Sequence, residues 1–113
     1  MRPSLSFFLL AAAAYAQDTR TVTEPAIPPS CFVLSAKRSA VDNKTLPEAD
    51  EDKLDTDRIQ KAIDACPKGQ AVELKADASH NAFLSGPLDL RAGVTLRVDA
   101  RTILFGSRDA RVY

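Results

Sequence analysis

The chain has 113 residues, which is enough for one ordinary domain, and its 15 basic side chains balance its 15 acidic ones. This balance excludes nucleic-acid binding through bulk positive charge. Two distant cysteines and one histidine, Cys31, Cys66 and His80, are too few ligands for a metal site, so none is expected.

Residues 1–16 have the pattern of a secretory signal peptide. Arg2 supplies the positive start, residues 5–15 form an apolar run, and Ala14 and Ala16 are the small residues that precede cleavage. Cleavage is expected between Ala16 and Gln17. The apolar run is shorter than the roughly 20 residues that span a bilayer. The sequence therefore predicts a secreted, extracellular or periplasmic protein without a membrane anchor. A disordered or buried N-terminal helix is the alternative.

Residues 17–54 are expected to form an extended lead-in and an acidic loop. Prolines in residues 25–29 fix φ and remove backbone donors, which favours extended chain. Residues 31–34 are a short apolar run, either a strand or a clip onto the body. Residues 42–57 carry an excess of carboxylates, which is typical of a solvated face. Asn43 begins a glycosylation sequon with Lys44 and Thr45.

A helix is predicted over residues 56–66, with Asp55 or Thr56 accepting hydrogen bonds from the free N–H groups of its first turn. Pro67 and Gly69 end it. The apolar residues fall at helical spacing and predict one buried stripe. They are Ile59, Ala62, Ile63 and Cys66.

Cys31 and Cys66 are expected to form a disulfide, because both follow the export signal and an oxidising compartment favours the bond. The bridge would pin the lead-in against the helix and stabilise the fold by roughly 3–4 kcal/mol. Two free, buried thiols are the alternative.

After Gly69 the apolar period changes from 3.6 to 2, which indicates strands. A self-comparison matches Val72 with Val94, Leu74 with Leu96 and Phe83 with Phe105, each at an offset of 22 residues. A period of this size indicates a solenoid of stacked parallel coils, with an antiparallel meander as the alternative. The predicted strands are near residues 72–74 and at residues 82–85, 88–90, 94–98 and 102–105.

Four segments resemble the beginning of the polygalacturonase family, glycoside hydrolase family 28. These are Asp55–Pro67, Leu84–Leu88, Gly93–Leu96 and Leu104–Asp109. The resemblance implies an all-β fold, a right-handed parallel β-helix, of which residues 55–113 would be the capping helix and about the first two coils. It also implies secretion and hydrolysis of α-1,4-galacturonide links in pectin by inversion, by a full-length enzyme that is monomeric and needs no cofactor.

The family's catalytic motifs are Asn-Thr-Asp, Asp-Asp, Gly-His-Gly and Arg-Ile-Lys, and none occurs in this sequence. No catalytic residue is therefore assigned, and the chain is expected to be an inactive N-terminal fragment or truncated gene product. A non-catalytic β-helical carbohydrate-binding or capping module is the alternative. A lyase of similar fold would need Ca²⁺-binding carboxylate clusters, which the sequence does not show.

Other polar residues have simple structural interpretations, and the substrate-binding residues are unknown at this point. His80 is expected in a solvated loop, and the acidic run at residues 50–52 would repel a polyanion. Four arginines have the chemistry to bind galacturonate carboxylates, but outward polar positions on strands and turns are the favoured interpretation. They are Arg97, Arg101, Arg108 and Arg111. Phe83, Ile103, Leu104 and Phe105 are expected in the core.

Overall fold

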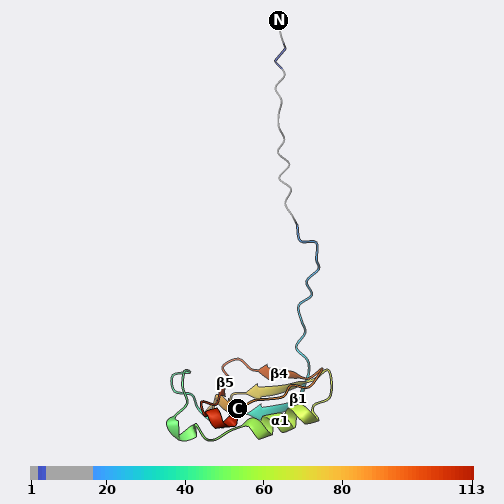
Figure 1. The fold of residues 1–113 in the computed structure, drawn as a ribbon. Coiled ribbons are helices and arrows are strands. Elements are labelled where there is room, and N and C mark those ends of the chain that lie inside the picture. Colours follow the sequence, from blue (N-terminus) through green and yellow to red (C-terminus); the bar gives the residue numbers. More distant parts are fainter. Residues whose placement is uncertain (1–2, 5–16) are drawn as a thin grey trace.

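A computed structural model describes residues 3–4 and 17–113. The predicted signal peptide, residues 1–16 with Ala16 at the cleavage site, lies outside the described residues except for residues 3–4. It therefore stays a prediction. Residues 17–29 contain no helix or strand, are almost entirely exposed, and leave the body as an extended segment (Figure 1). Within the described part of the chain, no helix has the length and apolar character needed to cross a membrane.

The body is built of parallel strands, so the antiparallel meander is wrong and the β-helical arrangement is confirmed (Figure 1). One sheet has the strand order β1-β2-β4, and a second pairs β3 with β5. The elements are β1 (Ser30–Ser35), the 3₁₀ turn η1 (Glu48–Asp50), α1 (Thr56–Ala65), β2 (Ala71–Lys75), β3 (Ala82–Ser85), β4 (Thr95–Val98), β5 (Ile103–Gly106) and the 3₁₀ turn η2 (Ala110–Val112). The apolar run at residues 31–34 is thus a strand of the first sheet.

The uniform 22-residue repeat is wrong. Val72 lies opposite Leu96, an offset of 24, whereas Phe83 lies opposite Leu104, an offset of 21. The two sheets differ because the turn between β2 and β3 spans residues 76–81, whereas the turn between β4 and β5 spans only residues 99–102. A change in turn length alters the offset without disturbing the pairing inside either sheet.

Residues 88–90 do not form the predicted strand. The Gln60 side chain of α1 holds both backbone groups of Asp89, accepting from its N–H at 2.8 Å and donating to its carbonyl oxygen at 3.0 Å. Pro87 has no N–H to offer a ladder. This segment is therefore held to the helix rather than to a sheet, with Leu88 packed on the core and Leu90 exposed.

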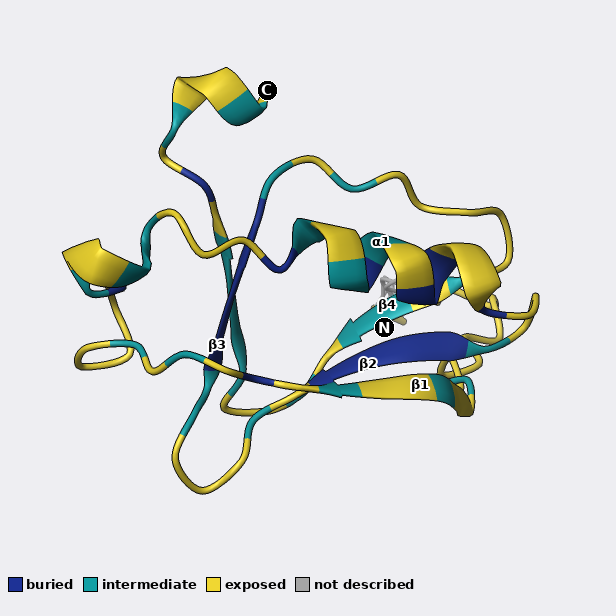
Figure 2. Cartoon of the chain, turned by 90° about the horizontal axis from the view of Figure 1, so that it is seen from below, coloured by how far each residue is buried: buried dark blue, intermediate teal, exposed yellow. Residues whose placement is uncertain are grey.

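The main core lies between α1 and the strands (Figure 2). The predicted helix stripe is confirmed, because Ile59, Ala62, Ile63 and Cys66 are all buried. Val72, Leu74 and Phe83 face these residues from β2 and β3, and each is fully buried. The helix therefore covers one side of the strands, as expected of a cap.

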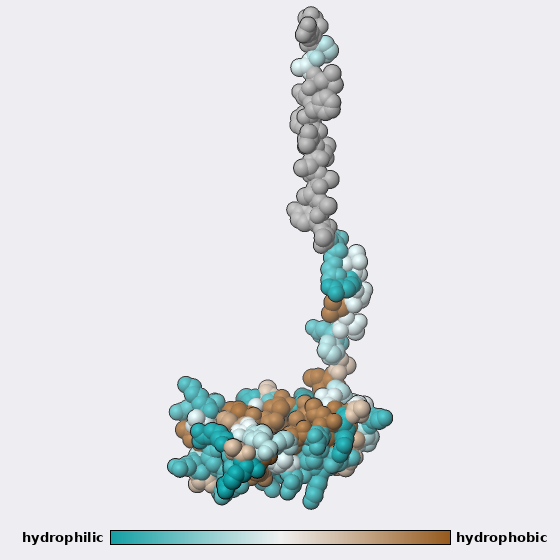
Figure 3. Space-filling model, in the orientation of Figure 1, coloured by the Kyte–Doolittle hydropathy of each residue, from teal (hydrophilic) through white to brown (hydrophobic). Residues whose placement is uncertain are grey.

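The opposite side is only partly covered. Ile103, Leu104 and Phe105 were expected in the core, but all three are half-buried. The reason is that β4 and β5 are the last strands of their sheets in the described chain, so no further strand covers them. Val98 on β4 is 43% exposed. Figure 3 shows apolar surface gathered on this side of the body.

Candidate functional site

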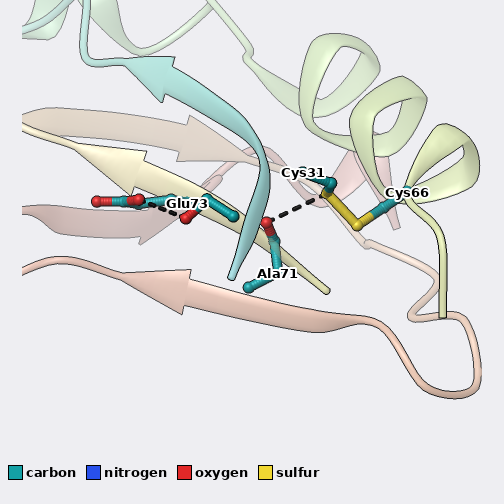
Figure 4. Close-up of a disulfide and its surroundings, with 5 residues drawn as sticks. Cys31, Cys66, Ala71 and Glu73 are labelled. Carbon is teal, nitrogen blue, oxygen red and sulfur yellow. Dashed lines mark hydrogen bonds between the residues drawn. A yellow bond between two sulfur atoms is a disulfide. The ribbon is translucent and has the colours of Figure 1, made fainter. Parts of the chain in front are cut away.

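The cysteine pair expected from the sequence is joined in the structure. Cys31 and Cys66 form a disulfide with Cα atoms 5.7 Å apart (Figure 4). The Sγ atom of Cys31 also contacts the carbonyl oxygen of Ala71 at 3.1 Å. Because Cys31 lies on β1 and Cys66 follows α1, the bond fastens an edge strand to the end of the helix that covers the core.

Asp55 precedes the helix as predicted, but its carboxylate does not cap the first turn. It is 2% exposed and accepts hydrogen bonds from Arg38, Arg58 and the backbone N–H of Leu84, at 2.5, 2.9 and 2.9 Å. Burial raises the pKa of Asp55, but the Leu84 hydrogen bond and the two arginines outweigh it and hold the pKa below its ordinary value. The carboxylate therefore joins three separate segments of the chain.

The helix start is tied to β3 and to the residue that follows it by two further contacts. The Thr56 hydroxyl oxygen also fails to cap the first turn and instead accepts from the Gly86 N–H at 2.8 Å. The Arg58 guanidinium carbon lies 4.9 Å from the centre of the Phe83 ring, within reach of a cation–π interaction. Both capping candidates thus serve tertiary contacts, which a reading of local helix signals does not anticipate.

A second polar cluster lies around Glu73 in the middle strand of the first sheet. The Ser30 hydroxyl donates to Glu73 at 2.6 Å, and Figure 4 draws this bond. The hydrogen bond from Ser30 is the main cause that lowers the pKa of Glu73. A hydrogen bond with the Asp99 side chain is the second cause. Arg97 pairs with Asp99 at 3.0 Å. The Glu73 and Asp99 side chains are hydrogen-bond partners, whereas inverting hydrolysis needs two carboxyl groups held roughly 6.5–9.5 Å apart with water between them.

Three of the four candidate arginines are engaged by carboxylates. Arg97 pairs with Asp99, Arg108 with Glu51 at 2.5 Å, and Arg111 with Asp109 at 2.7 Å. The Arg111 contacts lower the pKa of Asp109 to about 2. Glu51 of the acidic run is therefore part of an ion pair rather than a free charge. Arg101 has no carboxylate partner in the described part of the chain.

His80 lies in the turn between β2 and β3, as expected. Its Nδ1 lies 3.4 Å from an oxygen of Asp77. Backbone hydrogen bonds from Ser79 and then His80, both at 2.7 Å, lower the pKa of Asp77. This turn and Arg101 line a common hollow. Over residues 3–4 and 17–113, no group of three or more His, Cys, Asp or Glu side chains could hold a metal ion.

Known proteins similar to this chain are polygalacturonases. An endo-polygalacturonase of Pectobacterium carotovorum subsp. carotovorum is 40% identical over 93% of the chain, and a polygalacturonase of Ralstonia solanacearum is 40% identical over 97%. The solved polygalacturonase of Erwinia carotovora ssp. carotovora is similar over 86% of the chain, with a TM-score of 0.63 and 37% identity. No family model matches.

The resemblance to the polygalacturonase family is thereby confirmed in sequence and in structure. The chain is homologous to a part of these proteins and has the parallel β-helical arrangement of its structural neighbour. It spans only 22–23% of the length of these relatives and 22% of the solved chain.

Proposed function

We propose that residues 17–113 form the cap and first coils of an exported hydrolase that cleaves the α-1,4-galacturonide links of pectin. The observation that supports this most directly is the 40% identity to an endo-polygalacturonase over 93% of the chain. The 37% identity to a polygalacturonase of the same fold adds structural support. Residues 1–16 would direct export, and N-terminal sequencing of the exported protein should begin at Gln17.

The role of this part is to start the solenoid. A stacked parallel fold needs a polar terminal cap, because an uncovered end exposes apolar side chains and unpaired strand groups. The polar outer face of α1 and its buried stripe suit that role. The disulfide and the Asp55 contacts hold the cap in place, so that β4 and β5 can serve as the template for a following coil.

The chemistry belongs outside these residues. Inverting hydrolysis needs a carboxylic acid and a carboxylate separated by roughly 6.5–9.5 Å, with room for water between them. Glu73 and Asp99 are hydrogen-bond partners, and Asp55 is buried between two arginines. We therefore assign a structural role to these carboxylates, and the isolated chain should release no reducing ends from polygalacturonate.

A segment exchange tests the proposal. Residues 17–113 would replace the matching segment of the Pectobacterium carotovorum endo-polygalacturonase, and reducing ends released from polygalacturonate would be measured. We expect the hybrid to fold and retain activity, since its catalytic part is unchanged and its cap is homologous. The same hybrid carrying Asp55→Asn should be less stable, with the same activity per folded molecule.

Two results would contradict the proposal. A hybrid that folds, as judged by its cooperative thermal transition, but hydrolyses no polygalacturonate would show that this cap does not support the enzyme. Turnover by residues 17–113 alone would show that a catalytic carboxylate lies among the groups assigned here to structure.

A further inference from the structure

A hollow of about 390 Å³ opens beside the two turns that connect the sheets. Its volume lies within the roughly 300–1,000 Å³ of small-molecule sites. The turn between β2 and β3 supplies one wall, the turn between β4 and β5 another, and the loop after β1 a third. The polar lining includes Ser39, Asn43, Asp77, His80, Asn81 and Arg101.

The walls are fixed to one another by hydrogen bonds. The Ala76 N–H donates to the Thr102 hydroxyl oxygen at 2.9 Å, and the Ile103 N–H donates to the Asn81 carbonyl at 2.8 Å. The Asn81 side-chain amide donates to the Asn43 side chain at 2.9 Å. A preformed hollow loses less conformational entropy when it binds a ligand than a loose one.

Arg101 distinguishes this hollow from the rest of the surface. Every other arginine between residues 17 and 113 pairs with an Asp or Glu side chain. Arg101 has no such partner in the same range, and it lines the hollow. Its φ of 64° is in the left-handed region, which a non-glycine residue adopts at a cost of about 1–2 kcal/mol. Strained residues of this kind are enriched at ligand-binding sites.

The remaining groups suit a sugar acid. The Asp77 contact at the Nδ1 atom of His80 favours the proton on that nitrogen, which leaves Nε2 as an acceptor for a hydroxyl group. The Asp77 carboxylate is itself compensated by the N–H groups of Ser79 and His80. A guanidinium binds a carboxylate through two parallel hydrogen bonds.

We propose that this hollow binds a uronate residue of a pectic chain, with Arg101 on its carboxylate and His80 on a hydroxyl group. The choice of a uronate rests on the function proposed above. The site would hold polymer at the cap end of the molecule, away from the reacting bond, and would add affinity for long, unesterified chains.

Binding of trigalacturonate to the 113-residue chain, followed by amide chemical shifts in NMR spectra, tests this assignment. Arg101→Asn is the informative variant, because asparagine tolerates the left-handed backbone and removes the guanidinium that would bind the carboxylate. We expect binding about tenfold weaker, the effect of losing one charge-assisted hydrogen-bond pair. Arg101→Lys should bind trigalacturonate with an affinity between those of the wild type and Arg101→Asn. The matched control is Arg91→Gln, which removes the same charge from an exposed ion pair with Asp64 and should bind like the wild type.

The neutral methyl ester of trigalacturonate should bind weakly and equally to all these variants. Unchanged affinity in Arg101→Asn, an equal loss in Arg91→Gln, or no binding of trigalacturonate by the wild-type chain would overturn the site. The two proposals can fail separately. If the hybrid enzyme hydrolyses polygalacturonate but Arg101→Asn binds normally, only the site is wrong. If binding depends on Arg101 but the hybrid folds without activity, only the enzymatic function is wrong.

Discussion

Asp55 and Leu84 hold each other through two hydrogen bonds across 29 residues of sequence. The Asp55 N–H donates to the Leu84 carbonyl at 2.6 Å, and the Asp55 carboxylate accepts from the Leu84 N–H at 2.9 Å. Asp55 is thus tied to β3 through both its backbone and its side chain. Arg38 and Arg58 complete the neutralisation of its buried charge.

Asp55→Asn should destabilise the protein by about 3 kcal/mol, because it leaves Arg38 and Arg58 without their buried counter-charge. The measurement is the free energy of unfolding in urea. Asp57→Asn is the matched control, since it removes an exposed carboxylate from the same helix turn and should change stability by less than about 0.5 kcal/mol. Equal losses of unfolding free energy in the two variants would show that the buried Asp55 cluster stabilises the fold no more than an exposed carboxylate does.

Acid should weaken the fold through the same carboxylate. The pKa of Asp55 is lower in the folded protein than its ordinary value of 3.8, so the unfolded chain binds the proton more readily. Its stabilising contribution is therefore complete above about pH 4 and is lost as pH falls through the folded pKa. Urea unfolding at pH 6 and at pH 3 should show a smaller loss for Asp55→Asn than for the wild type. An identical loss would exclude Asp55 as a source of acid sensitivity.

Removing the disulfide should cost about 4 kcal/mol in the chain-entropy model, because the bond closes a loop with a sequence separation of 35. The double variant Cys31→Ala/Cys66→Ala should unfold at a correspondingly lower urea concentration. Wild-type protein under reducing conditions should behave in the same way, which separates the loss of the bond from the loss of the sulfur atoms. A reduced wild type as stable as the oxidised form would contradict this expectation.

Two glycines with positive φ should respond differently to alanine. Gly69 has φ 85° and open space around the position of an added Cβ, whereas an added Cβ at Gly93 would lie 3.2 Å from Lys68 side-chain carbons. Gly69→Ala should cost about 1–2 kcal/mol from backbone strain alone. Gly93→Ala should cost more, because Lys68 must also move. Thermal unfolding of both variants measures the difference, and a larger loss at Gly69 would be contrary to this account.

The uncovered side of β4 should promote self-association of residues 17–113 when they are produced alone. Val98 lies on that edge strand and is 43% exposed. A lysine on an edge strand hinders pairing with another chain. Val98→Lys should therefore raise the monomer fraction in size-exclusion chromatography. Val22→Lys, in the extended lead-in where Val22 is 85% exposed, adds the same charge and should have no effect.

The sequence predicted the elements that depend on local pattern. The helix stripe of Ile59, Ala62, Ile63 and Cys66 was visible because burial on one side imposes a 3.6-residue period. The parallel fold followed from resemblance and repetition. The exact register could not be obtained from a single offset, because residues 76–81 and 99–102 make turns of unequal length.

The polar contacts were harder to predict because their partners lie far away in the sequence. Asp55 looks like a helix cap locally, and only its approach to Leu84 and Arg38 reveals a different role. Nothing in the neighbourhood of Glu73 points to Asp99 either. For Arg101, the informative feature is that it has no carboxylate partner in the described part of the chain. This can be recognised only from three-dimensional positions.

The unequal offsets of the two sheets have a consequence for how such a chain can change over time. Because β2 with β4 and β3 with β5 keep their pairing although the connecting turns differ in length, residues 76–81 can gain or lose positions without moving a core side chain. Indels should therefore accumulate at this corner of the coil. New recognition surfaces can arise in this turn while the pairing of the stacked strands stays the same.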